Sequence, residues 1–113
     1  MSVPKKNNIF NVSDIKNNNP QEEIFENLFK NENLRIERII SSGQFTPENE
    51  WLVQDIDEWV ILLQGESVLK FYNNQTINLS KGDYIHIPAN TKHRVEHTSN
   101  EPICIWLAVH YMS

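Results

Sequence analysis

The sequence predicts an all-β fold, a closed antiparallel barrel or sandwich with one short helix near its N-terminus. Two observations lead to this prediction: short segments in which apolar residues recur at every second position, and tight-turn residues between them. Such segments fill most of the 113-residue chain from Leu34 onward. In order they are LRIERII, EWVILLQ, SVLKFY, QTINLS, YIHIP, TKHRVEH and ICIWLAVHY, at 34–40, 58–64, 67–72, 75–80, 84–88, 91–97 and 103–111. Between the third and fourth segments, Asn73-Asn74 favours a hairpin turn, because asparagine tolerates positive φ.

The helix is predicted to run from Asn19 to about Asn31. Asparagine is a good N-cap, and Pro20 suits the first helical position. Four apolar residues then fall on one face at helical spacing, namely Ile24, Phe25, Leu28 and Phe29. We expect the helix to pack on the sheet through this face.

The chain is predicted to divide into a flexible N-terminal segment, residues 1–18, and a single domain, residues 19–113. Residues 1–18 are polar and rich in asparagine, so they bury too little apolar surface to hold themselves in place. Their short apolar patch, from Ile9 to Val12, is able to add a strand to the folded domain.

Composition and charge indicate which partners and which cellular compartment to expect. The net charge is −5 with acids and bases interspersed, so no basic stripe is present to neutralise nucleic-acid phosphates. No segment has the character of a signal peptide or a membrane span. The single cysteine, Cys104, lies in an apolar run and fits a reducing compartment. We therefore expect a cytoplasmic protein with neither a nucleic-acid nor a membrane partner.

Several predicted strands are apolar on both faces. In the segment 58–64, Val60 and Leu62 share one face, and Trp59 and Ile61 share the other. A barrel interior buries only one face of each strand, so the other face needs a helix, a second layer or a partner. One short helix covers only part of this surface, and we therefore expect a homodimer.

Two segments carry turn residues and titratable residues at a recognisable spacing. Glu58, six residues and Gly65 match the second half of the motif G-x5-H-x-H-x3,4-E-x6-G. The segment from Gly82 through Pro88 to His93 matches the motif G-x5-P-x-G-x2-H-x3-N. Asn90 stands in the place of its second glycine, and His97 in the place of its asparagine.

These are the two motifs of the cupin family, and the chain resembles small single-domain bacterial cupins over about residues 34–111. The resemblance implies a double-stranded β-helix, which is an antiparallel jelly-roll barrel. It also implies that Glu58 and His93 are ligands of one divalent transition metal, Fe, Mn, Ni or Zn. The two histidines that complete such a ligand set are missing, because their positions hold Trp51 and Val53, or Leu52 and Gln54 at the shorter spacing.

Two protein ligands hold a transition metal poorly. A third donor would have to be Gln54, His97 or His110. The alternative is a barrel without a metal, in which Glu58 and His93 form a buried carboxylate–imidazole pair.

Strand alternation supports the same candidate site without the family. Glu58 shares a face with Val60 and Leu62, and a carboxylate in an apolar interior is costly unless it is paired. By the same alternation, His93 and His97 share a face. The predicted ligand-binding residues are Gln54, Glu58, His93 and His97, with Glu58 and His93 as the metal ligands if a metal is bound. No catalytic residue is assigned.

Three functions remain open at this point. The leading one is the binding of a small polar ligand inside the barrel, with or without a divalent metal. The second is a metal-dependent oxygenase, lyase or isomerase. The third is a non-catalytic dimeric scaffold with a vestigial pocket. The fold does not decide between an enzyme and a binding protein, because it hosts many unrelated functions.

Overall fold

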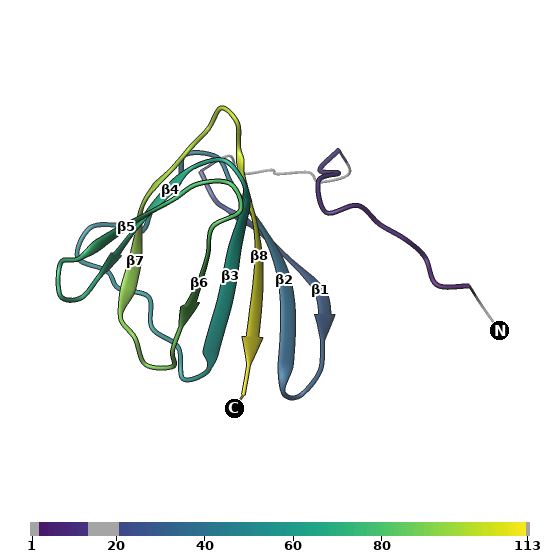
Figure 1. Cartoon of the computed structure of the whole chain (residues 1–113), viewed down its shortest axis with the longest axis horizontal. Helices are drawn as coiled ribbons and strands as arrows, with labels where there is room; N and C mark the ends of the chain where they lie inside the picture. The colour runs from purple at the N-terminus through teal and green to yellow at the C-terminus, as the bar shows by residue number, and fades with distance from the viewer. Residues whose placement is uncertain (1–2, 14–20, 113) are drawn as a thin grey trace.

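The protein is described by a computed structural model that covers residues 3–13 and 21–112. The all-β prediction is confirmed, with antiparallel strands arranged in two sheets (Figure 1). The larger sheet has the order β1-β2-β8-β3-β6, and the smaller has the order β5-β4-β7. The strands are β1 (Ile24–Lys30), β2 (Leu34–Ser41), β3 (Asp57–Gln64), β4 (Ser67–Phe71), β5 (Thr76–Leu79), β6 (Tyr84–Ile87), β7 (His93–Thr98) and β8 (Cys104–Tyr111). The part of the chain described here contains no helix long and apolar enough to cross a membrane.

The predicted N-terminal helix is wrong for the residues that the structure describes. Ile24–Lys30 forms strand β1, which pairs antiparallel with β2 at the edge of the larger sheet. The register shifts between Asn27 and Phe29, so Leu28 is the extra residue of a β-bulge. The bulge gives the apolar residues the irregular spacing that favoured a helix. The predicted start of the helix, Asn19-Pro20, lies outside the described residues.

The strand register gathers polar side chains at one end of the barrel interior. Glu58 of β3 lies opposite His110 of β8, and His110 lies opposite Arg35 of β2. The following inward-facing positions are apolar and form the core, with Val60, Leu62, Leu69, Leu79, Ile87, Trp106 and Ala108. This row of polar side chains therefore borders an apolar interior.

Asn74 and Asn90 adopt the left-handed conformation that their turns require. Asn74 has φ 67°, which confirms the hairpin predicted at Asn73-Asn74. Asn90 has φ 64° at the position where the second motif carries glycine. Asparagine is the non-glycine residue best suited to this conformation, so the departure from the motif leaves the turn intact.

Residues 3–13 contain a turn but no strand. The strand addition considered for Ile9 to Val12 is therefore absent from the described residues. Instead, this segment contacts β2 through Arg38, as described below. The flexibility expected for residues 1–18 stays a prediction.

Candidate functional site

A cavity of about 560 Å³ lies inside the barrel, between the larger sheet and β4 and β7 of the smaller one. Its apolar wall includes core residues and the aromatic rings of Phe25, Phe45, Trp51 and Trp106. Its polar side chains are Glu23, Arg35, Glu37, Thr46, Glu50, Gln54, Glu58, His93 and His110. This mixture of apolar wall and few polar groups is typical of sites for small molecules.

Glu58 is buried in the row of polar residues at one end of the cavity. Gln54 Nε2 donates a hydrogen bond to Glu58 Oε1 at 3.3 Å, and His110 Nε2 lies 3.7 Å from Glu58 Oε2. Burial raises the pKa of the Glu58 carboxyl group, and the neighbouring imidazoles of His110 and His93 partly oppose the rise. The carboxyl group therefore takes up a proton more readily than an exposed glutamate.

His110, which the sequence offered only as a possible third metal donor, lies in the site beside Glu58. It is buried on β8, and its Nε2 lies 3.1 Å from Glu37 Oε1, so the imidazole donates a hydrogen bond to that carboxylate. Its Nδ1 is buried without a hydrogen-bond partner among the described residues. Only the pairing of β8 with β3 brings His110 beside Glu58, and the sequence alone does not give that register.

His93 reaches the same cavity from the opposite sheet. Its Nδ1 lies 2.9 Å from the backbone oxygen of Thr91, and this carbonyl oxygen can only accept, so Nδ1 carries a proton. The Nε2 atom of the neutral ring is then an acceptor, and it has no hydrogen bond to any residue that the structure describes. His93 is therefore oriented by its own strand and keeps one nitrogen for a ligand.

The segment of residues 45–54 closes the cavity beside β7. The backbone N and O of His93 pair with the O and N of Leu52 at 3.0 and 2.7 Å. The buried Arg94 guanidinium donates to the backbone oxygens of Thr46 at 2.8 Å and Pro47 at 3.2 Å. The backbone N of Asn90 donates to the oxygen of Gln54 at 2.6 Å. These backbone contacts hold the segment that carries the Gln54 side chain toward Glu58.

His97 does not reach the cavity. The register of β7 with β4 shifts, so that Val68 pairs with His97 and Leu69 pairs with Val95. Glu96 is thus the extra residue of a bulge, which reverses the alternation after Val95. His97 is exposed, away from the face that it was expected to share with His93. Of the four predicted ligand-binding residues, the structure brings Gln54, Glu58 and His93 together.

A second, half-buried carboxyl group, that of Glu23, also lines the cavity. Trp106 Nε1 donates to Ser41 Oγ at 3.2 Å, and the Ser41 hydroxyl donates to Glu23. Burial raises the pKa of Glu23, although the hydrogen bond from Ser41 opposes this. The cavity thus carries four carboxyl groups, from Glu23, Glu37, Glu50 and Glu58, and a single guanidinium among its described lining, from Arg35.

The donor set does not match a transition-metal centre. Within residues 3–13 and 21–112, no three His, Cys, Asp or Glu side chains are placed to hold one ion together. Trp51 and Val53 line the cavity at one of the registers where the missing histidines would stand. Their side chains offer no ligand atom.

Comparisons with known proteins agree with this architecture. The family model described as "Cupin domain" matches residues 40–110. A structure from Ralstonia eutropha JMP134, described as a "putative mannose-6-phosphate isomerase", is 36% identical and covers 97% of this chain and 100% of its own, with a TM-score of 0.87. A cupin superfamily protein from Desulfitobacterium hafniense DCB-2 is 18% identical and covers 100% of this chain and 97% of its own, with a TM-score of 0.75.

A third similar structure defines the fold type. The cupin family protein from Methanocaldococcus jannaschii, described as having a double-stranded β-helix fold, is 19% identical, with a TM-score of 0.66. It covers 88% of this chain and 87% of its own. A comparison with curated proteins found no match.

Proposed function

The chain belongs to the cupin domain family, and we propose that it binds a small, uncharged, hydroxylated organic molecule in the cavity of its double-stranded β-helix. One observation carries the proposal: Glu58 and His93 enter the same cavity from opposite sheets, each with hydrogen-bonding capacity directed at its contents. A ligand between them would be held from both sides.

The chemistry of the lining favours a ligand with several hydroxyl groups. The Glu58 carboxylate accepts hydrogen bonds, Arg35 donates them, and Gln54 does both. A hydroxyl group can satisfy either kind of partner. The rings of Trp51 and Trp106 offer flat apolar surfaces for the carbon face of such a molecule. A sugar or polyol has this combination of hydroxyl edges and apolar faces.

The charge of the cavity disfavours a phosphorylated ligand. Four carboxyl groups face a single guanidinium in the described lining, and Arg35 already lies 3.9 Å from Glu37. A phosphate group would meet net repulsion there. We therefore expect a neutral monosaccharide to bind roughly tenfold more tightly than its phosphate ester, a difference of about 1.4 kcal/mol. The description of the Ralstonia eutropha protein names a phosphorylated sugar. We do not propose a phosphorylated ligand for this chain.

The binding proposal is tested by calorimetric titration and thermal shift with a panel of neutral sugars, polyols and their phosphates. We expect at least one neutral member to raise the melting temperature, and His93→Ala to abolish the rise. His97→Ala is the matched control, because His97 lies on the same strand but is exposed. A panel in which no member binds, or equal losses in the two variants, would contradict the proposal and favour a scaffold with a vestigial pocket.

A proton-transfer isomerase is the second candidate, and it is supported by the two titratable groups on opposite walls. With a hydroxycarbonyl ligand, the His93 Nε2 would take a proton from the carbon beside the carbonyl group, and protonated Glu58 would give a proton to the carbonyl oxygen. The raised pKa of Glu58 supports its role as the proton donor. We expect ligand incubated with protein in D₂O to gain deuterium at that carbon. Binding without exchange would leave the protein as a binder only.

Metal dependence is the remaining alternative, since members of the cupin family often bind metals. If present, an ion would be held by Glu58 and His93 and would act as a Lewis acid on a ligand oxygen. Among the described residues, no third His, Cys, Asp or Glu is placed to share the ion with them, and this favours a function without a metal. We expect binding to persist in protein treated with a chelator. If the chelator abolishes binding and added Fe, Mn, Ni or Zn restores it, the function depends on a metal instead.

A further inference from the structure

The carboxyl group of Glu23 marks a second polar end of the cavity, away from the Glu58 end. Glu23 is hydrogen-bonded to Ser41, which is the last residue of β2. Arg35, near the start of β2, belongs to the polar row of Glu58 and His110. The stretch of β2 from Arg35 to Ser41 spans about 20 Å. The function proposed above uses the Glu58 end and leaves the Glu23 end without a role.

A chain of hydrogen bonds fixes the Glu23 carboxyl group. Trp106 Nε1 donates to Ser41 Oγ at 3.2 Å, and the Ser41 hydroxyl donates to Glu23 Oε2. Ser41 is fully buried and Trp106 is 5% exposed, so these two side chains have little freedom to move. Within the described residues, Glu23 Oε1 makes no hydrogen bond. The carboxyl group is thus held by one oxygen and keeps the other for a ligand.

Two phenyl rings lie beside this carboxyl group. Phe25 follows Glu23 by two positions, so the two side chains point to the same side of the chain, and both line the cavity. Phe45 comes from the segment after β2, where Gln44 Nε2 donates to the backbone oxygen of Glu22 at 3.3 Å. That contact brings Phe45 beside Glu23. The carboxyl group and the two rings therefore share one end of the cavity.

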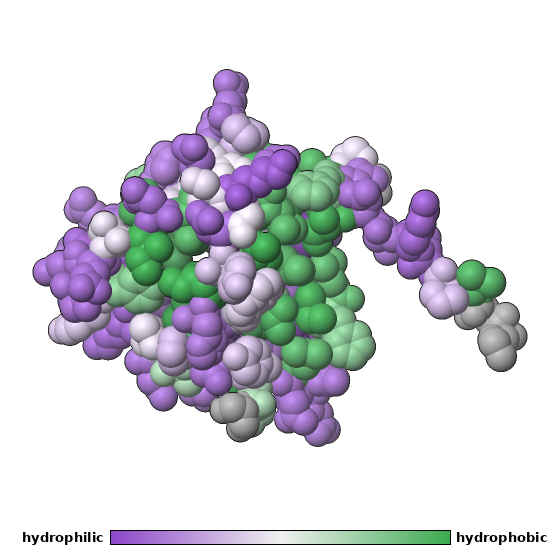
Figure 2. Space-filling model, in the orientation of Figure 1, coloured by the Kyte–Doolittle hydropathy of each residue, from purple (hydrophilic) through white to green (hydrophobic). Residues whose placement is uncertain are grey.

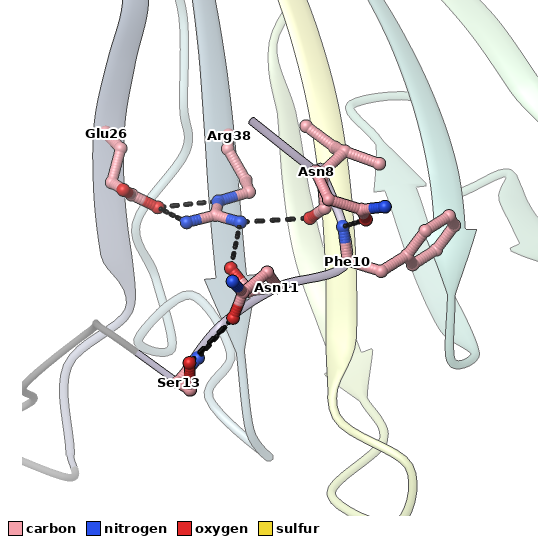
Figure 3. A network of polar contacts seen from close by, with 7 residues as sticks. Asn8, Phe10, Asn11, Ser13, Glu26 and Arg38 are labelled. Atoms are coloured by element: carbon pink, nitrogen blue, oxygen red, sulfur yellow. Dashed lines mark hydrogen bonds and ion pairs between the residues drawn. The ribbon is translucent and has the colours of Figure 1, made fainter. Parts of the chain in front are cut away.

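The edge strand that carries Phe25 is fixed from its other face. Arg38 of β2 is only 7% exposed, and its Nε and Nη2 both lie 2.6 Å from Glu26 Oε1 of β1 (Figure 3). Its Nη1 donates to the backbone oxygens of Ile9 at 3.0 Å and Asn11 at 2.8 Å. Because neighbouring side chains of a strand point to opposite faces, the ion pair that holds Glu26 on the outer face turns Phe25 toward the cavity.

The Glu23 end of the cavity is open to solvent, and no basic side chain of the described residues lies in its lining. Phe25 is 59% exposed and Phe45 is 60% exposed, although both line the cavity. Hydrophobic side chains gather over β1 and β2 on the face seen in Figure 2. Arg35, the single guanidinium of the described lining, lies at the other end, 3.9 Å from Glu37. A carboxylate beside accessible aromatic rings is suited to a cationic ligand.

We propose that the Glu23 end of the cavity is a second binding site, which takes an organic ammonium ion with at least one N–H group. The N–H group donates to Glu23 Oε1, and the faces of the Phe25 and Phe45 rings stabilise the positive charge. The ion also offsets the cost of the half-buried carboxylate. The cavity volume of about 560 Å³ lies in the range of pockets for drug-sized ligands, roughly 300–1,000 Å³, so a monosaccharide at the Glu58 end leaves room for the ion.

The test is calorimetric titration of the full-length chain with cyclohexylammonium chloride and with cyclohexanol, its neutral analogue, at constant ionic strength. We expect the ammonium ion to bind about tenfold more tightly than the alcohol, and Glu23→Gln to remove this preference. The glutamine oxygen still accepts the hydrogen bond from Ser41, so the variant keeps its fold. Glu48→Gln is the matched control, because Glu48 is an exposed glutamate outside the cavity lining. It should leave the preference unchanged.

A third variant tests the aromatic part of the site. Phe45→Leu keeps an apolar side chain but removes the ring, so it should weaken binding of the ammonium ion by roughly threefold and leave binding of the alcohol unchanged. Equal affinities of wild type for the two compounds, or a preference that survives Glu23→Gln, would overturn the proposed site. Equal losses in Glu23→Gln and Glu48→Gln would overturn it too, because they would reflect only the overall negative charge. The titrations need no sugar, so their outcome is independent of the function proposed for the Glu58 end.

Discussion

The Glu58 carboxyl group lies in surroundings that disfavour its ionised form. It is buried beside an apolar core, and its compensation consists of the Gln54 amide at 3.3 Å and the His110 imidazole at 3.7 Å. Such incomplete compensation is costly in the absence of a ligand. Residues that reduce stability in this way are common in binding and catalytic sites, where a ligand completes the hydrogen bonds.

This leads to a pH-dependent prediction for Glu58→Gln. The pKa of Glu58 in the folded chain is above its usual value of 4.5, so the folded state binds more protons than the unfolded state between the two values. The contribution of Glu58 to the free energy of unfolding therefore falls as pH rises through that window. Glutamine does not titrate, so the stability of the variant relative to wild type should grow as the pH rises above 4.5.

Urea denaturation at a series of pH values measures this difference. Glu32→Gln is a suitable control, because Glu32 is exposed in the turn between β1 and β2. A stability difference for Glu58→Gln that stays flat or shrinks with rising pH would show that burial does not dominate at this carboxyl group. At neutral pH the variant should be both more stable and unable to bind the ligand.

Two glycines in turns differ in what an added methyl group would meet. At one, only the backbone would be strained, and at the other, the methyl group would also overlap neighbouring atoms. Gly65, after β3, has φ +93°, and a Cβ there would lie 2.8 Å from both Cys104 Sγ and Ser99 Oγ. Gly82, before β6, has φ +91°, but a Cβ there would meet nothing within 4 Å. Ala at either position has to adopt a positive φ, which costs about 1 kcal/mol or slightly more.

We therefore expect Gly82→Ala to lower the free energy of unfolding by about 1 kcal/mol and Gly65→Ala to lower it by roughly 3 kcal/mol. Thermal and urea denaturation of the two variants at neutral pH measure the difference. Equal losses would mean that the space beside Gly65 adapts to the added methyl group. The comparison also explains why Gly65 is the residue that ends this apolar strand.

Most strands could be predicted from the sequence because alternation and turn residues are local signals. The segments 34–40, 58–64 and 103–111 match β2, β3 and β8 within a residue or two. The errors occur at two of the bulges, those in β1 and β7. Leu28 gave β1 the apparent spacing of a helix, and Glu96 turned His97 out of the cavity. A bulge depends on the pairing partner, which is far away in the sequence, so the local pattern does not report it.

The candidate site could be predicted in part for the same reason. Glu58 and His93 were recognisable from motif spacing and from the cost of burying charged groups. His110 and Glu37 join them only through the register of β8 with β3 and β2. That register is a property of the assembled sheet, and no short stretch of sequence contains it.

In the molecule as a whole, the two faces of the larger sheet have different surroundings. Inward side chains of β2, β3 and β8 line the cavity, and the outward side chains of the same strands include the apolar residues of the outer face. This explains why these strands read as apolar on both faces.

A crystal structure of the protein with a neutral sugar selected by calorimetry would decide whether the cavity is the binding site. We expect density for the sugar between Glu58 and His93, with a hydroxyl group within hydrogen-bond distance of His93 Nε2 and another at the Glu58 carboxylate. Density for the bound sugar outside the barrel, with no sugar density between Glu58 and His93, would contradict the proposed function.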